Sequence, residues 1–327
     1  MTKTLLTVLA AALVVLGMAA GSSRGARDAG PLTAGDHDIV LPFGGRARSY
    51  RVFVPTSATG GRPHPVVVNF HGGGSNAAGE ERFSEMDHAA SRYGFVVVYP
   101  NGTGVLPNAL LTWNAGTCCG YAKAHDVDDV GFTLAVIDDV ARRLPVDRRR
   151  VYATGMSNGA MMAYRLAVDA SMRIAAIAPV AGGMVVQSFA PARPVPVMHF
   201  HSLDDPRALY KGGLGPPFPG TNTRVLHPPV ERVIADWVRF DGCVAVPQVR
   251  PTISSGGKTA TEIVYAPCRQ GTEVVLWRLT GSGHVWPGGQ QNLGPLARRL
   301  LGQPTNVVDA NELMWRFFQR HPLPAGG

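Results

Sequence analysis

Residues 150–160 read Arg-Val-Tyr-Ala-Thr-Gly-Met-Ser-Asn-Gly-Ala, and this stretch decides the fold. Its first half is an apolar, β-branched run that predicts a strand, and the Ala-, Met- and Leu-rich residues 158–168 predict a buried helix. Between them, a Gly-x-Ser-x-Gly pattern at 155–159 is typical of a sharp strand-to-helix turn. Such a turn exposes a hydroxyl at the carboxyl end of the strand, so Ser157 is a candidate nucleophile.

Near-continuous apolar runs elsewhere predict further strands that are buried on both faces, as in a parallel sheet. They lie at 49–54, 66–70, 95–99, 175–179, 197–201 and 273–279. Helical patterns between them lie at 130–144, 229–240 and 311–318. This alternation predicts an α/β domain with a mostly parallel central sheet and helices on both faces. Because residues 203–228 and 286–306 are rich in Gly and Pro, we expect loops there and no separate domains.

The N-terminus has the layout of a secretory signal peptide. Lys3 is followed by an apolar run over 5–20 and by small residues at 21–23. The run of about 16 residues is shorter than the roughly 20 that a spanning helix needs, although a retained membrane anchor stays an alternative. We expect cleavage near the end of this segment, a loose lead-in over 24–37 and one catalytic domain over 38–327. The predicted location is secreted or periplasmic, without membrane contact after cleavage.

The composition of the 327-residue chain excludes several protein classes. It is 45% hydrophobic and 17% charged, which excludes a disordered chain and a long coiled coil. The formal net charge is +8, with small clusters of arginine, yet no nucleic-acid-binding motif accompanies them. We therefore expect no nucleic-acid partner.

A second glycine-rich turn, His-Gly-Gly-Gly at 71–74, follows the predicted strand at 66–70. Glycines leave backbone N–H groups open to a developing oxyanion. The second donor in such sites is the N–H of the residue after the nucleophile. We therefore expect Gly73 and Asn158 to form an oxyanion hole, with an ordinary glycine turn as the alternative.

His284 is the candidate base for Ser157, because small residues flank it in a loop beyond the last predicted strand. The chain order of nucleophile, acid and histidine in this kind of fold places the acid between them. Asp204 and Asp205 both follow a predicted strand, and either one would orient the imidazole. Asp241 is a weaker candidate, because it ends a helix.

The four cysteines are Cys118, Cys119, Cys243 and Cys268. They include no Cys-x-x-Cys pair and no clustered histidine, so we expect no metal site. We expect a Cys243–Cys268 bridge, which closes a loop of about 25 residues and stabilises the fold by roughly 3 kcal/mol. Cys118 and Cys119 are adjacent, so a vicinal bridge, another pairing and free thiols all stay open.

Together these motifs resemble the secreted esterase family that includes polyhydroxybutyrate depolymerase-like proteins, feruloyl esterases and acetylxylan esterases, on the α/β-hydrolase fold. The resemblance extends over about residues 38–320. Besides the His-Gly-Gly-Gly turn, its markers are Trp-Asn-Ala-Gly at 113–116, Asp-Asp-Val-Gly-Phe at 128–132, Gly-Met-Ser-Asn-Gly-Ala at 155–160 and Gly-His-Val-Trp-Pro-Gly-Gly at 283–289.

The resemblance implies a catalytic triad of Ser157, His284 and Asp205. The family's His-Gly-Thr-Ala-Asp-Pro stretch corresponds to His-Ser-Leu-Asp-Asp-Pro at 201–206, whose spare Asp204 keeps the choice of acid open. It also implies hydrolysis of short-chain hydroxyalkanoate, phenolic or acetyl esters through an acyl-enzyme, without a cofactor. The partner is then a small or oligomeric ester. The resemblance further supports the Cys243–Cys268 bridge.

His71, Trp113 and Trp286 are candidate substrate-binding residues, and each tryptophan has the alternative role of a packing anchor. Two other functions stay open. A prolyl-oligopeptidase-like serine peptidase shares the triad but usually carries a large second domain. A non-catalytic, ligand-binding hydrolase fold has no use for all three triad residues.

Overall fold

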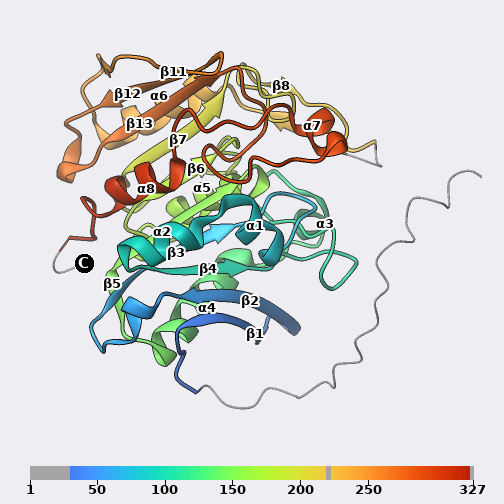
Figure 1. The fold of residues 1–327 in the computed structure, drawn as a ribbon, viewed down its shortest axis with the longest axis vertical. Helices are drawn as coiled ribbons and strands as arrows, with labels where there is room; N and C mark the ends of the chain where they lie inside the picture. The colour runs from blue at the N-terminus through green and yellow to red at the C-terminus, as the bar shows by residue number, and fades with distance from the viewer. Residues whose placement is uncertain (1–29, 219–221, 325–327) are drawn as a thin grey trace, which may run out of the picture.

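The structure is a computed structural model that describes residues 30–218 and 222–324. The predicted signal peptide lies outside the described residues. The strands of the main sheet are β1 (Gly35–Phe43), β2 (Arg46–Val54), β3 (His64–Phe70), β4 (Val96–Pro100), β5 (Val146–Met156), β6 (Ile177–Val180), β7 (Val197–Ser202), β10 (Gln248–Val249), β11 (Ile253–Ser255), β12 (Lys258–Tyr265) and β13 (Val274–Thr280). Their spatial order is β1-β2-β4-β3-β5-β6-β7-β13-β12-β10, and β11 pairs with β12 (Figure 1).

The centre of the sheet is parallel and its two edges are antiparallel. Strands β4, β3, β5, β6, β7 and β13 run parallel to one another. The β1–β2 hairpin and β12 with its partners add antiparallel edges. Every residue of β3, β4, β6 and β7 is buried, which explains why most of their residues are apolar. The predicted mostly parallel α/β architecture is confirmed.

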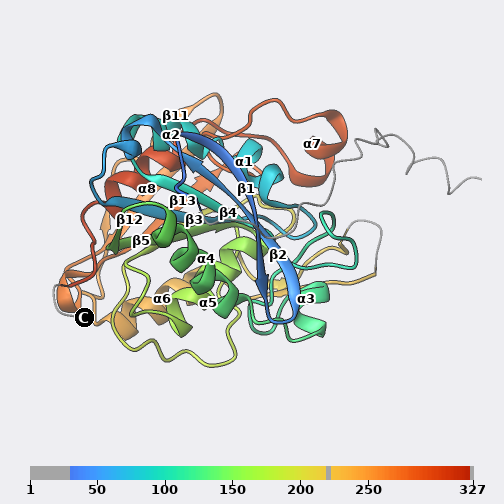
Figure 2. The ribbon, with the colours of Figure 1, turned by 90° about the horizontal axis from the view of Figure 1, so that it is seen from below.

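Helices cover both faces of the sheet. They are α1 (Ala77–Ser84), α2 (Met86–Tyr93), α3 (Gly120–Ala124), α4 (Asp129–Arg143), α5 (Asn158–Asp169), α6 (Val230–Asp241), α7 (Pro295–Leu301) and α8 (Ala310–Phe318). One face packs on α4, α5 and α6, and the other on α1, α2 and α8 (Figure 2). Among the described helices, none is long and apolar enough to span a membrane.

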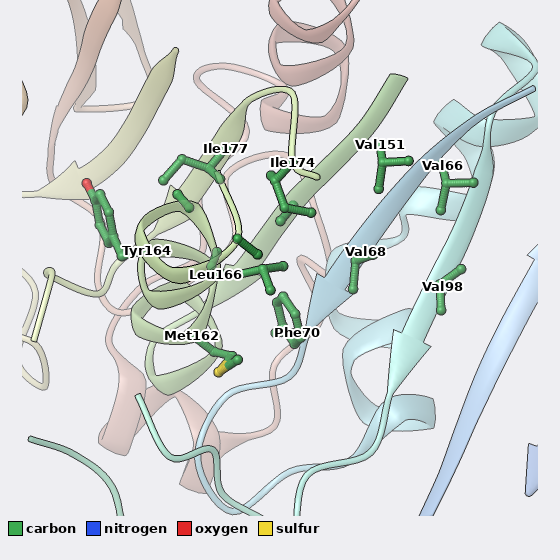
Figure 3. Packing of buried hydrophobic residues seen from close by; sticks show 14 of the residues in the cluster. Val66, Val68, Phe70, Val98, Val151, Met162, Tyr164, Leu166, Ile174 and Ile177 are labelled. Atoms are coloured by element: carbon green, nitrogen blue, oxygen red, sulfur yellow. The ribbon is translucent and has the colours of Figure 1, made fainter. Parts of the chain in front are cut away.

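Strand β3 shows how one strand serves two cores. Val66 and Val68 point toward α5, where Met162 and Leu166 complete the cluster (Figure 3). Val67 points to the opposite face and joins the second cluster. Alternate residues of a strand face opposite sides of the sheet, so a run of valines fills both cores at once.

Several elements differ from the sequence-based prediction, since the sequence pattern does not predict α1, α2, α3, β10, β11, β12, β8 (Gly213–Leu214) and β9 (Leu226–His227). Strand β1 begins at Gly35, inside the predicted lead-in over 24–37, and turns into β2 through Gly44 and Gly45. Both glycines have positive φ, 57° and 72°, as a tight two-residue hairpin requires. Helix α7 lies within the predicted loop at 286–306, and it has no buried residue that would reveal a periodic pattern.

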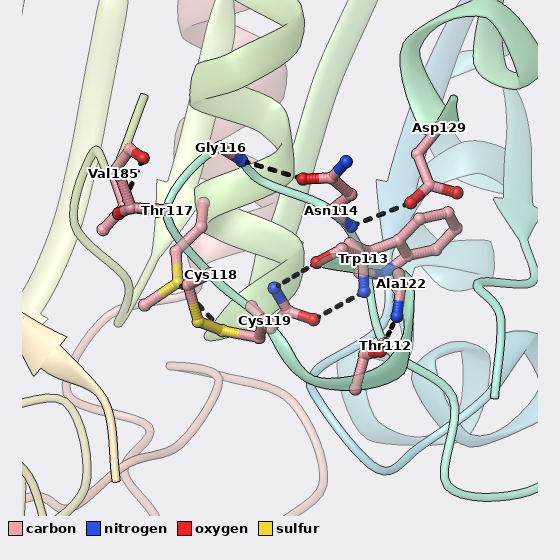
Figure 4. Close-up of a disulfide and its surroundings, with 12 residues drawn as sticks. Thr112, Trp113, Asn114, Gly116, Thr117, Cys118, Cys119, Ala122, Asp129 and Val185 are labelled. Carbon is pink, nitrogen blue, oxygen red and sulfur yellow. Dashed lines mark hydrogen bonds between the residues drawn. A yellow bond between two sulfur atoms is a disulfide. The ribbon is translucent and has the colours of Figure 1, made fainter. Parts of the chain in front are cut away.

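Both cysteine pairs are bonded. The predicted Cys243–Cys268 bridge is present and joins the end of α6 to the segment after β12. Cys118 and Cys119 form a vicinal disulfide, which is one of the three arrangements left open by the sequence (Figure 4).

Candidate active site

Ser157 occupies a strained turn between β5 and α5. Its backbone has φ 57° and ψ −117°, and its N–H donates to the carbonyl oxygen of Val180 at 2.9 Å. The flanking glycines are required by close packing: a Cβ on Gly159 would lie 2.0 Å from the Phe70 carbonyl oxygen, and one on Gly155 would lie 2.6 Å from the same atom. Glycine at both positions lets the turn pass against the end of β3 and present the serine.

His284 and Asp205 meet because β7 and β13 are neighbouring parallel strands. Asp205 follows β7, His284 follows β13, and the imidazole Nδ1 lies 2.8 Å from the carboxylate Oδ2. Asp204 is exposed and instead accepts the N–H of Gly281 at 2.7 Å. Of the two adjacent carboxylates, Asp205 is therefore the one that faces the imidazole.

The Asp205 carboxylate is buried and receives several donors. Its Oδ1 accepts the backbone N–H groups of Arg207 at 2.7 Å and of Ala208 at 2.9 Å. The Nε2 atom of His201 lies 3.5 Å from Oδ2. Burial alone would raise the pKa of Asp205, but the charge of His284 and the donors from both histidines outweigh it and hold the pKa well below its usual range. The group is therefore a carboxylate at neutral pH.

The loop that carries His284 lies close to the serine turn. Gly283 and Val285, its chain neighbours, line a small cavity of about 10 Å³ together with Val180, whose carbonyl binds the Ser157 N–H. Ser157, His284 and Asp205 thus all follow the carboxyl ends of parallel strands, β5, β13 and β7, at the edge of the sheet where α/β folds place their sites.

The His-Gly-Gly-Gly turn packs directly against the serine turn. A Cβ on Gly72 would lie 3.6 Å from the Ser157 Cβ, and one on Gly73 would lie 3.5 Å from the Asn158 Cβ. The Gly74 N–H is occupied, since it donates to the carbonyl of Leu111 at 2.8 Å. Asn158 is the first residue of α5, and the first amides of a helix have no acceptor within it. The turn therefore brings Gly73 beside a free helix N-terminus.

The three candidate substrate-binding residues are buried. Gly102 donates its N–H to the Nε2 of His71, whose Nδ1 lies 2.8 Å from the Gly72 carbonyl, and burial lowers the His71 pKa to about 4. Trp113 donates its indole N–H to the His71 carbonyl at 2.9 Å. Trp286 is 1% exposed and donates to Asn311 at 3.0 Å. This placement favours the packing role for both indoles and a structural role for His71.

A network that sequence analysis missed anchors the loop around Trp113. The Asn158 side chain accepts the Trp113 N–H at 2.8 Å and donates to the Trp113 carbonyl at 3.2 Å. The next N–H, of Asn114, donates to buried Asp129 (Figure 4). Asp129 also pairs with buried Arg48 at 2.7 Å. The Trp-Asn-Ala-Gly and Asp-Asp-Val-Gly-Phe motifs therefore contact each other.

Two further residues near the site lie in the Gly- and Pro-rich segment that contains the short β8 (Gly213–Leu214) and β9 (Leu226–His227). The ring of Phe218 lies over the glycine turn, where a Cβ on Gly74 would come within 2.6 Å of it. His227 is buried, and burial together with the charge of His284 lowers its pKa to about 4. No periodic pattern in the sequence singles out either residue.

One group of carboxylates among the described residues has the spacing of a metal site: Asp36, Glu81 and Asp87. Glu81 already pairs with Arg51, and Asp87 accepts the hydroxyl of Tyr99 at 2.7 Å. The group belongs to β1, α1 and α2 and shares no residue with the serine, histidine and carboxylate set.

Comparisons with known proteins agree with this geometry. The family model described as "Esterase PHB depolymerase" matches residues 48–241. Feruloyl esterase B of Piromyces equi is 29% identical over 244 residues, covering 73% of this chain and 42% of that protein. Feruloyl esterase D of Neurospora crassa is 26% identical over 330 residues, covering 97% of this chain and 96% of that protein. This chain thus spans less than half the length of the Piromyces relative.

A solved structure shares the fold. The acetyl xylan esterase from Aspergillus awamori superimposes with a TM-score of 0.55 at 15% sequence identity, covering 82% of this chain and 98% of that one. With the family match over residues 48–241, it follows that the chain belongs to the esterase family of the PHB depolymerase type and has the α/β-hydrolase fold.

Proposed function

We propose that the protein is a secreted serine esterase that hydrolyses carboxylic esters through Ser157, His284 and Asp205. The observation that carries the proposal is the 2.8 Å contact between the Asp205 carboxylate and His284, at the sheet edge where the serine turn lies. A buried, ionised carboxylate on Nδ1 leaves the opposite ring nitrogen, Nε2, as the acceptor for a serine proton.

The reaction has two halves. The His284 Nε2 takes the hydroxyl proton as the Ser157 oxygen attacks the ester carbonyl, and Asp205 stabilises the imidazolium. The N–H groups of Gly73 and Asn158 hold the tetrahedral oxyanion, a role whose loss costs about 2.7–4 kcal/mol per donor. His284 then protonates the leaving alcohol, and water, activated by the same nitrogen, releases the acid and restores the serine.

The substrate class rests on the relatives. Proteins named feruloyl esterase and acetylxylan esterase match this chain, which favours phenolic and acetyl esters, and the family match adds short-chain hydroxyalkanoate esters. Export is supported by the basic and apolar pattern at 3–23 and by two disulfides, which persist in oxidising compartments.

The decisive experiment compares wild type with Ser157→Ala on an ester panel. The panel holds p-nitrophenyl acetate and butyrate, methyl ferulate, acetylated xylan and polyhydroxybutyrate film, and it ranks the substrate classes. We expect the variant to retain its melting temperature and to lose hydrolysis on every substrate. Full activity in the variant would refute the proposed function.

A further inference from the structure

Three buried side chains form a hydrogen-bonded row behind the Asp205 carboxylate. Tyr164 projects from α5, on the side away from Val68 and Phe70 (Figure 3), and its hydroxyl lies 2.9 Å from the Nδ1 of His199. The His199 Nε2 lies 3.0 Å from the Nδ1 of His201. The exposed fractions of these three residues are 0%, 0% and 2%, so this Tyr-His-His row is closed to solvent.

The contact between His201 and Ala208, at the end of the row, fixes which nitrogen of the His201 ring carries a proton. The His201 Nε2 lies 2.7 Å from the carbonyl oxygen of Ala208, and a carbonyl can only accept, so Nε2 carries the proton. Burial keeps the pKa of His199 well below its ordinary value, so this ring is neutral. With a single proton on His201, at Nε2, its Nδ1 accepts from the His199 Nε2–H, and His199 accepts at Nδ1 from the Tyr164 hydroxyl. All three donors therefore point along one direction, toward Asp205.

The row ends on the turn that holds the triad acid. Ala208 accepts from His201 with its carbonyl and donates its own N–H to the Asp205 Oδ1 at 2.9 Å. The His201 N–H also faces Oδ2 at 3.5 Å. The same oxygen receives the His284 imidazole at 2.8 Å. His201 thus fixes the backbone that holds the carboxylate and directs a donor at the carboxylate itself.

We propose that His201 is a positioning residue for Asp205, and that His199 and Tyr164 support the ring tautomer in which it acts. The inference rests on the proposed function, since it assigns Asp205 as the triad acid. Aligned donors in a dry interior polarise one another, and they favour the carboxylate orientation that keeps His284 in place. None of the three residues takes part in the chemical step.

A merely structural role for the row makes a different prediction. The row joins α5 to β7, so its loss could lower stability and activity without any link to Asp205. A positioning residue acts only through the carboxylate, so its effect on kcat must vanish once that carboxylate is gone. A double-mutant cycle separates the two roles.

The experiment measures kcat, KM and melting temperature for His201→Phe in the wild-type and the Asp205→Asn backgrounds. We expect a loss of kcat of about 10²-fold with little change in KM in the first background, as for a misplaced catalytic group, and less than a twofold loss in the second. His201→Gln, which keeps an N–H near the Nε2 position, should recover most of the lost kcat. If His201→Phe does not fold, Tyr164→Phe removes a single oxygen atom, and its smaller loss of kcat should vanish in the same background.

Val197→Ala is the matched control, because Val197 is buried at the other end of the same strand and lies outside the row. Its effect should be equal in both backgrounds. Long-range ¹H–¹⁵N spectra give a readout that does not need activity: His199 and His201 should both carry the proton on Nε2. Equal losses in both backgrounds, or a proton on the His201 Nδ1, would overturn the inference while leaving the esterase intact. Activity that survives Ser157→Ala would refute the proposed function itself.

Discussion

The substitution Gly159→Ala adds one methyl group where the serine turn crosses the end of β3. The added Cβ would lie 2.0 Å from the Phe70 carbonyl oxygen and 2.7 Å from that of His71, whereas ordinary contact begins at 3.4 Å. The turn and the strand end must therefore separate by about 1.4 Å. Because the opposing atoms belong to the backbone, no change of side-chain rotamer relieves the contact.

Two losses follow from this separation. Overpacking of a tight site lowers the free energy of unfolding by about 1–3 kcal/mol, and we expect the upper end here. The displaced segment leads into Gly73, so the oxyanion donors move relative to Ser157, and a misplacement near 1 Å lowers kcat/KM by about 10²-fold. Urea denaturation measures the first loss, and hydrolysis of p-nitrophenyl acetate measures the second.

Gly60→Ala is the matched control for the same chemical change. Gly60 has φ −84°, and nothing lies within 4 Å of an added Cβ. We expect this variant to keep wild-type kinetics and to stay within about 1 kcal/mol of wild-type stability. If Gly159→Ala matches Gly60→Ala in both assays, the serine turn is not packed against β3 as described.

Two further predictions concern carboxyl groups. Asp205→Asn should lower kcat on p-nitrophenyl acetate by about 10⁴-fold, as loss of a triad acid does, and Asp204→Asn by less than about tenfold; equal losses would contradict the assignment. Glu80 is buried, and burial raises its pKa from 4.5 to about 8, so the folded state holds a proton that the unfolded state releases. Wild-type stability should therefore fall as the pH rises from 4.5 toward 8, and Glu80→Gln should remove that loss. We expect the variant to gain about 3 kcal/mol at pH 7 and almost nothing at pH 4 in urea denaturation, whereas a gain independent of pH would rule out this titration.

The central sheet could be predicted because its strands are buried on both faces. Such strands are rich in apolar residues, as the valine runs of β3 and β4 show. Strand β1 and helix α7 carry no such signal. Alternate residues of β1 are only half-buried and the exposed residues between them include two aspartates, and α7 contributes no buried residue. Helices and strands that bury little apolar surface do not produce the periodic apolar pattern from which they could be predicted.

The residues of the candidate site also differ in how far the sequence alone could predict them. Ser157 and His284 could be named from their glycine-rich contexts, because glycine is needed where a turn packs against backbone. The choice between Asp204 and Asp205 depends on which carboxylate turns inward after β7, and the amides of Arg207 and Ala208 decide this in three dimensions. A sequence pattern can indicate which residues are buried, but it does not show which hydrogen-bond partners they have.

Asp129 and Asn158 show why motifs without any chemistry of their own accompany the serine turn. Asn158 has the backbone amide that we propose for the oxyanion hole, while its side chain binds both the N–H and the carbonyl of Trp113. The neighbouring Asn114 amide is held by Asp129, which Arg48 neutralises inside the core. Oxyanion stabilisation depends on donors that are fixed before the charge develops. The Arg48–Asp129 ion pair, from residues far from Ser157 in the sequence, and the Asn158 side chain together hold the segment at 113–114 that contacts Asn158.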